Sequence, residues 1–138
     1  AVPTAWSSAN EEWNFGILMM YIATVFWIIG YDTIYGCQDK NEDEVLGIKN
    51  SAVSAQKFLS VFVGSSYFIT FLLLLFSGYL LNANYIWFIG VFLCGFHYVS
   101  QVVKLKNLEN NNPLKIFKSN VTPGLILTAS ALSSYLTF

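Results

Sequence analysis

The sequence predicts an all-α protein, a polytopic bundle of transmembrane helices. Hydrophobic residues make up 55% of the 138 residues and charged residues only 11%, whereas a soluble domain carries about 25% charged residues. Several uncharged apolar stretches are each long enough to form a membrane-spanning helix. The polar segments between them differ sharply in lysine content. The net charge of −1 argues against a nucleic-acid partner, because such a partner needs a basic surface.

Four stretches are predicted to cross the membrane, at residues 15–31, 58–81, 85–103 and 120–138. The second contains 24 residues without a charge, and a polar turn at 82–84 separates it from the third. Residues 104–119 are predicted to form a polar connector, because a run of asparagines followed by Pro113 interrupts any continuous helix. Pro123 is compatible with the first turn of the fourth span.

The lysines provide an independent test of this layout. Alternating spans place residues 32–57 and 104–119 on one side of the membrane, and residues 1–14 and 82–84 on the other. All basic residues lie on the first side: Lys40, Lys49, Lys57, Lys104, Lys106, Lys115 and Lys118. Since positively charged loops face the cytoplasm, we expect this side to be cytoplasmic in a bacterial inner membrane, or to face the matrix in a mitochondrial inner membrane.

Residues 31–50 form the one strongly acidic stretch of the chain, with five of the eight carboxylates between Asp32 and Glu44. Asp32, Asp39 and Asp43 would lie within roughly 40° of one another on a continuous helix, with Tyr35 on the flank of the same stripe. Such a column of carboxylates repels itself unless a cation neutralises it. Mg²⁺ prefers oxygen ligands and is often shared between carboxylates and phosphates. The alternative interpretation is a solvated loop or helix start without a ligand.

A sequence pattern around these aspartates has a known counterpart. It reads Asp32-x-x-Tyr35-x-x-x-Asp39-x-x-x-Asp43, between Gly30-Tyr31 and Gly47-Ile48-Lys49. This pattern resembles the second aspartate-rich motif of the UbiA superfamily of intramembrane prenyltransferases, and is most similar to the branch that prenylates 4-hydroxybenzoate. The chain departs from that pattern at positions that are not presumed ligands: Gly36, Cys37, Val45 and Asn50. Residues 97–101 and 112–125 resemble the closing region of the same family, so the resemblance covers nearly the whole chain.

The resemblance implies transfer of a polyprenyl group from polyprenyl diphosphate to an aromatic acid, in ubiquinone biosynthesis. Asp32, Asp39 and Asp43 would be the Mg²⁺ ligands, and Asp32 would also contact the substrate. Tyr35 would shield the allylic cation by a cation–π contact. Lys49 would attract the phosphates if the chain bends near Gly47, and is otherwise a solvated lysine. Most other aromatic residues are expected to pack in the core or to face lipid.

Several alternatives follow from what the sequence contains. The family uses two aspartate-rich motifs and this chain has only the second, which implies the C-terminal part of a larger bundle of about nine helices. Such a part is expected to be inactive without the missing N-terminal half. Other branches of the family, which make menaquinone, haem or chlorophyll side chains, are the first alternative. A small divalent-cation transporter is the second, but transport needs ionisable groups inside the spans, and His97 is the only one there.

Four further polar or reactive residues have simpler interpretations: Cys37, Cys94, His97 and Gln101. Cys37 and Cys94 have no paired spacing for a metal or a disulfide framework, so both are predicted to be buried thiols. His97 and Gln101 lie four residues apart, on one face of a helix. They form either a hydrogen-bonded pair between packed helices or a direct contact to the substrate.

Overall fold

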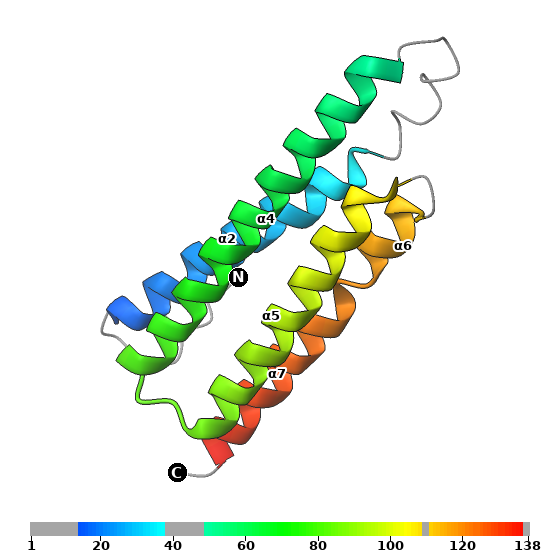
Figure 1. The fold of residues 1–138 in the computed structure, drawn as a ribbon. Helices are drawn as coiled ribbons and strands as arrows, with labels where there is room; N and C mark the ends of the chain where they lie inside the picture. Colours follow the sequence, from blue (N-terminus) through cyan, green and yellow to red (C-terminus); the bar gives the residue numbers. More distant parts are fainter. Residues whose placement is uncertain (1–13, 38–48, 109–110, 137–138) are drawn as a thin grey trace.

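The described part of the chain consists of helices joined by turns and short connecting segments, without a strand. The structure is a computed structural model and describes residues 14–37, 49–108 and 111–136. It contains the helices α2 (Phe15–Tyr35), α4 (Lys49–Leu80), α5 (Tyr85–Lys106), α6 (Pro113–Lys118) and α7 (Val121–Leu136) (Figure 1). The prediction of an all-α fold is therefore confirmed.

Three of the helices are long and apolar enough to cross a membrane. They are Phe15–Tyr35, the part Lys57–Leu80 of α4, and Tyr85–Lys106. The stretches predicted at 15–31, 58–81 and 85–103 thus form helices of the length and composition that a span requires. The fourth span, predicted at 120–138, is not confirmed, because α7 has 16 residues. At 1.5 Å per residue it rises about 24 Å, which is less than the roughly 30 Å of a hydrocarbon core.

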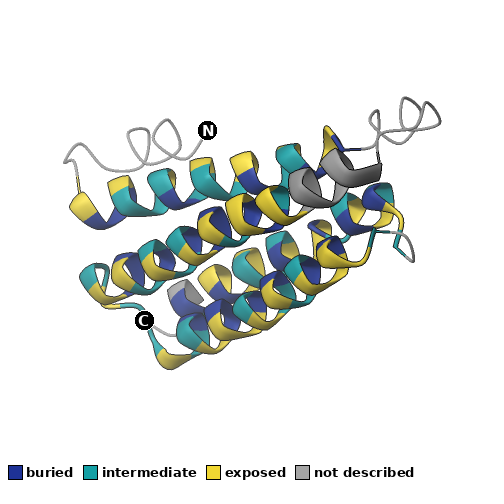
Figure 2. Cartoon of the chain, turned by 45° about the horizontal axis from the view of Figure 1, so that its top comes forward, coloured by how far each residue is buried: buried dark blue, intermediate teal, exposed yellow. Residues whose placement is uncertain are grey.

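Helix α4 lies at the centre of the packing. It contacts α2 on one side and α5 on the other, and α5 in turn packs against α7 (Figure 1). The short helix α6 contacts both α2 and α5. Buried residues face the interior of this arrangement and exposed residues face its perimeter (Figure 2). The helices α2 and α7 are thereby held as the two walls of a groove.

The perimeter of the bundle carries large apolar side chains. Phe58, Tyr79 and Phe96 are 73%, 73% and 74% exposed. A soluble monomer rarely exposes contiguous apolar patches of this kind, whereas a lipid-facing surface requires them. Tyr67, in contrast, is only 2% exposed and packs in the core.

Close helix packing in the core depends on residues without a side chain. A Cβ atom at Gly30 would lie 2.5 Å from Cε1 of Tyr67, which is closer than real Cβ atoms approach a ring. Glycine at this position therefore lets the Tyr67 ring lie directly against the backbone of α2. A Cβ atom at Gly90 would collide with Ser130 in the same way, so α5 and α7 also approach closely.

Candidate active site

Asp32 lies in the last turn of α2 and its side chain is exposed. The helix ends three residues later, at Tyr35, where the backbone N–H of Gly36 donates to the carbonyl of Asp32 at 2.9 Å and that of Cys37 donates to Ile34 at 3.2 Å. Helix α2 therefore ends before Asp39, with a turn at residues 36–37. The stripe through Asp39 and Asp43 stays a prediction, because both residues lie outside the described part of the chain.

The predicted ligand set is only partly described. Asp32 and Tyr35 lie on α2, three residues apart, and both are exposed. Asp39 and Asp43 lie outside the described residues. Lys49 is the first residue of α4, but its side chain is not among those described. Within residues 14–37, 49–108 and 111–136, Asp32 is the only carboxylate, so the proposed metal site remains a prediction.

An aromatic ladder borders Asp32. It consists of Trp27, Tyr31 and Tyr35 on α2, together with Phe117 on α6. The ring centroids of Tyr31 and Phe117 are 5.8 Å apart, and those of Tyr35 and Phe117 are 5.0 Å apart. Trp27 meets Tyr31 edge-on at 5.8 Å. Because Tyr31 and Tyr35 lie on either side of Asp32 in the sequence, the ladder fixes the helix surface from which this carboxylate projects.

Helix α6 holds the far side of this ladder. It lies inside the stretch 104–119 that was predicted to be a polar connector without a continuous helix, and it begins at Pro113 after α5 has ended at Lys106. Its start follows from two residues: the Asn112 side chain accepts a hydrogen bond from the N–H of Leu114 at 2.9 Å, and Pro113 occupies the first helical turn. Asparagine is a preferred N-cap, and proline is favoured at the first helical position. The same Asn-Pro pair therefore ends one segment and begins the next helix.

Four exposed lysines occupy the same end of the bundle as Asp32. They lie on the last turn of α5 and on α6, the helix that contacts α2: Lys104, Lys106, Lys115 and Lys118. Lysines near a helix C-terminus also interact favourably with its partial negative charge. This end of the bundle therefore presents both a carboxylate and a group of cations.

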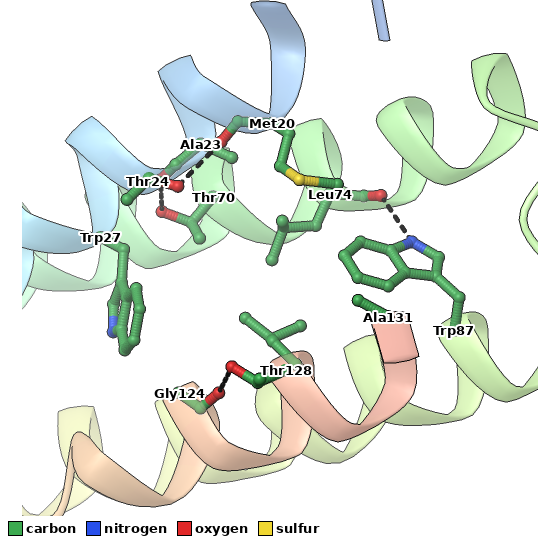
Figure 3. A pocket seen from close by; sticks show the side chains of 11 residues that line it. Met20, Ala23, Thr24, Trp27, Thr70, Leu74, Trp87, Gly124, Thr128 and Ala131 are labelled. Carbon is green, nitrogen blue, oxygen red and sulfur yellow. Dashed lines mark hydrogen bonds between the residues drawn. The ribbon is translucent and has the colours of Figure 1, made fainter. Parts of the chain in front are cut away.

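A groove of about 240 Å³ begins beside Trp27 (Figure 3). Its other lining residues on α2 precede Trp27 in the helix, so the groove continues away from Asp32. Three helices and the indole of Trp87 line it: Met20, Ala23, Thr24 and Trp27 from α2, Thr70 and Leu74 from α4, and Gly124, Leu127, Thr128 and Ala131 from α7. Trp27 and Trp87 lie at its two ends (Figure 3). Trp27 precedes Asp32 by five residues on the same helix, which corresponds to about 7.5 Å along the axis.

The polar groups that line this groove bind to the protein itself. The hydroxyls of Thr24, Thr70 and Thr128 donate to backbone carbonyls at 2.9, 3.0 and 2.8 Å. The indole N–H of Trp87 donates to the carbonyl of Leu74 at 3.2 Å. A ligand in the groove would consequently meet methyl groups, ring faces and methylenes. The polar groups of the groove already donate to backbone carbonyls and are not offered to the ligand. The groove suits a hydrocarbon ligand.

A buried asparagine joins the groove to the turn between α6 and α7. The side-chain oxygen of Asn120 accepts hydrogen bonds from the indole N–H of Trp27 at 3.1 Å and from the hydroxyl of Tyr67 at 3.3 Å. Its side-chain nitrogen donates to the carbonyl of Phe117 at 3.1 Å. One side chain therefore connects α2, α4 and the end of α6.

His97 and Gln101 form the hydrogen-bonded pair that their spacing predicted. Their side-chain nitrogens are 3.1 Å apart, and the Gln101 amide donates to Ser119 Oγ at 2.8 Å and to the Ile116 carbonyl at 3.3 Å. Gln101 is completely buried. These contacts tie α5 to the residues at the end of α6. Both cysteines are buried, as predicted.

The sequence interpretation missed Trp27, Phe117 and Asn120. One signal was available: Trp27, Tyr31 and Tyr35 recur at intervals of four residues, which places aromatic rings along one side of a helix immediately before and after Asp32. Nothing local in the sequence reveals Asn120, because its partners Trp27 and Tyr67 lie 93 and 53 residues away.

Comparison with known proteins gives one consistent family. The model of the UbiA prenyltransferase family matches residues 1–121. A 4-hydroxybenzoate octaprenyltransferase of Serratia proteamaculans is 28% identical over 134 residues, which are 97% of this chain and 46% of that protein. One of the same name from Francisella tularensis subsp. mediasiatica is 33% identical over 126 residues, 91% of this chain and 43% of that protein.

The chain thus spans a little under half the length of these curated relatives. No solved structure matches it. The family model nevertheless covers most of the 138 residues, including the pattern from Asp32 to Asp43 and the turn at Asn120. The chain belongs to the UbiA prenyltransferase family.

Proposed function

We propose that this protein transfers a polyprenyl group from polyprenyl diphosphate to 4-hydroxybenzoate inside a membrane, in ubiquinone biosynthesis. The observation that carries the proposal is the position of Asp32 at the end of the helix that also lines the apolar groove. A prenyl diphosphate has the matching polarity, because an anionic head is joined to a hydrocarbon tail. The names of the similar proteins from Serratia and Francisella agree with this substrate class.

The groove would hold part of the prenyl tail. Its volume of about 240 Å³ is below the roughly 300–1,000 Å³ of pockets for drug-sized ligands, so it accommodates a segment of a long polyprenyl chain. The threonine hydroxyls keep their donors on backbone carbonyls. Burying hydrocarbon here therefore leaves no polar group unsatisfied.

The diphosphate would lie at the Asp32 end. The exposed carboxylate of Asp32 is an oxygen ligand of the kind that Mg²⁺ prefers, and Asp39 and Asp43 would complete the set. Mg²⁺ held by these carboxylates would neutralise the charge that develops on the leaving diphosphate. Lys49 would attract the phosphates, and Lys115 and Lys118 on α6 would add to the positive potential.

The reaction would take place at C1, the allylic carbon of the prenyl chain, beside Tyr35 and Phe117. The bond between C1 of the prenyl chain and the diphosphate oxygen breaks, and its electron pair leaves with the diphosphate. A carbon of the acceptor ring forms the new bond to C1, and the ring proton is lost to water. Tyr35 would shield the transient allylic cation with its ring face. The Phe117 ring, whose centroid lies 5.0 Å from that of Tyr35, would hold it in place.

The lysines indicate which side of the membrane this end faces. We place it in the cytoplasm, or in the matrix for a mitochondrial protein, because Lys104, Lys106 and Lys115 lie there. In a background without Cys37 and Cys94, Lys115→Cys should resist an impermeant thiol reagent applied to intact cells. Tyr85→Cys, at the opposite end of α5, should react. Labelling of the Lys115 position with protection of the Tyr85 position would contradict this orientation.

The activity itself can be measured directly. The complete open reading frame that contains this chain is expressed in membranes of a strain without its own 4-hydroxybenzoate prenyltransferase, and supplied with 4-hydroxybenzoate and octaprenyl diphosphate. We expect a prenylated product that requires Mg²⁺ and disappears with a chelator. Prenylation of a menaquinone, haem or chlorophyll precursor in its place would assign the protein to another branch of the family. Absence of transfer to every acceptor would overturn the proposal.

A further inference from the structure

We propose that Asn120 is a positioning residue that sets the rotation of α2, and thereby the direction in which the Asp32 carboxylate points. The inference rests on the proposed function, because it treats Asp32 as a metal ligand. Asn120 itself lies in the α6–α7 turn and is 7% exposed. It acts on the acidic end of α2 through Trp27 and through Phe117.

The orientation of the Asn120 amide follows from its partners. The indole N–H of Trp27 can only donate, so the atom 3.1 Å away must be the amide oxygen. The carbonyl oxygens of Ile116 and Phe117 can only accept, so the atom 3.4 and 3.1 Å from them must be the amide nitrogen. With Tyr67 as its second donor at 3.3 Å, the oxygen has both acceptor positions filled. No other rotation of the amide satisfies these partners.

The surroundings make these bonds costly to break. Asn120 and Tyr67 are only 7% and 2% exposed, so water has little access to these groups. An indole N–H or a hydroxyl released from Asn120 would therefore remain unsatisfied. Tyr67 can reach Asn120 only because Gly30 leaves room for its ring beside α2. The Tyr67 ring also stacks on Tyr98, with centroids 4.6 Å apart. Tyr67 of α4, which is itself packed on Tyr98 of α5, therefore keeps the Asn120 side chain in the position where it binds Trp27.

Helix α6, which precedes this turn, contacts α2 at two further points. Phe117, whose carbonyl is bound by Asn120, places its ring against Tyr31 and Tyr35. Contacts at 27, 31 and 35 lie on one stripe that covers about 80° of the helix circumference. Asp32 lies about 60° beyond this stripe, next to Tyr35. These contacts, spread over two helical turns, add to the packing of α2 on α4 and restrict its rotation. They thereby help to set where Asp32 points.

The test uses the complete open reading frame in detergent micelles and the binding of Mn²⁺ with pyrophosphate, followed by electron paramagnetic resonance. Asn120→Leu keeps the approximate volume but removes the acceptor. We expect it to weaken Mn²⁺ binding about tenfold or more, the effect of losing a residue that orients a ligand. The indole ¹⁵N–¹H resonance of Trp27, assigned through Trp27→Phe, should shift at the same time. Asn120→Asp, which restores an acceptor oxygen, should recover both properties in part.

A matched control lies in the preceding segment. The Asn111 amide also donates to two backbone carbonyls, those of Lys104 and Asn107, but no hydrogen bond joins it to α2. Asn111→Leu should leave Mn²⁺ affinity and the Trp27 resonance unchanged. If Asn120→Leu does not accumulate, Tyr67→Phe removes one of the two donors and should weaken Mn²⁺ binding about threefold.

Two results would count against the inference in different ways. Unchanged Mn²⁺ affinity in Asn120→Leu, with a shifted Trp27 resonance, would show that the hydrogen bond exists but does not position the ligand. Failure of the unsubstituted protein to bind Mn²⁺ would overturn the proposed metal site, and the inference with it.

Discussion

Asp32→Asn should lower the kcat of prenyl transfer by about a hundredfold or more, the loss expected when a group that stabilises charge in the transition state is removed. The substitution preserves the shape of the side chain and removes its charge, and Mg²⁺ prefers the anionic ligand. The measurement is octaprenyl transfer to 4-hydroxybenzoate by membranes that contain the complete reading frame, over a range of Mg²⁺ concentrations. Part of the loss should be recovered at high Mg²⁺.

The same substitution, Asp32→Asn, should not lower the thermal stability of the protein. Asp32 lies in the last turn of α2, where the helix carries partial negative charge and has no basic residue to offset it. Neutralising this carboxylate should therefore leave the thermal unfolding midpoint unchanged or slightly raised. A loss of activity without a loss of stability separates a functional carboxylate from a structural one.

Glu42→Gln is the matched control for Asp32→Asn. It removes a charge from the same acidic stretch but from a position outside the Asp-x-x-Tyr-x-x-x-Asp-x-x-x-Asp pattern. We expect it to change kcat little. Equal losses in the two variants at saturating Mg²⁺ would show that the stretch acts through its total charge, and the assignment of Asp32 as a ligand would be wrong.

The elements that the sequence predicted correctly depend on local signals. Uncharged apolar runs locate the spans that the structure forms as α2, α4 and α5, because backbone groups in lipid must be satisfied within a helix. Asp32 and Tyr35 were expected on a helix and lie on one. The stripe through Asp39 and Asp43 assumed that this helix continues, but α2 ends at Tyr35, and the two later aspartates lie outside the described residues.

The features that the sequence did not reveal depend on contacts between distant residues. The groove is formed by residues of α2, α4 and α7, which are distant in the sequence. The sequence also does not reveal that the hydroxyls of its threonines donate to backbone carbonyls, which leaves the groove apolar. The role of Asn120 can be recognised only when the positions of its partners Trp27 and Tyr67 are known. Helix α6 was missed for a different reason, since Asn112-Pro113 was interpreted only as an interruption although it is also a good helix start.

A substitution in the groove is expected to weaken binding of the prenyl substrate strongly. Ala131 lines it beside Trp87, at the end away from Trp27 (Figure 3). Ala131→Trp should fill that end and displace part of the prenyl tail. Each displaced methylene-sized group loses about 0.8 kcal/mol of burial, so three such groups weaken binding of octaprenyl diphosphate roughly fiftyfold. The expected result is a raised KM for octaprenyl diphosphate with a smaller change in kcat.

Two comparisons make this result specific. Geranyl diphosphate has a tail of only two isoprene units, which ends nearer to Asp32, so its KM should rise much less than that of octaprenyl diphosphate. Ala129→Trp introduces the same side chain two residues earlier in α7, about 160° around the helix, at an exposed position that does not line the groove. It should leave both KM values unchanged. Equal effects of the two tryptophans, or equal effects on the two diphosphates, would show that the prenyl tail lies elsewhere, since only a chain that reaches the Trp87 end of the groove can distinguish them.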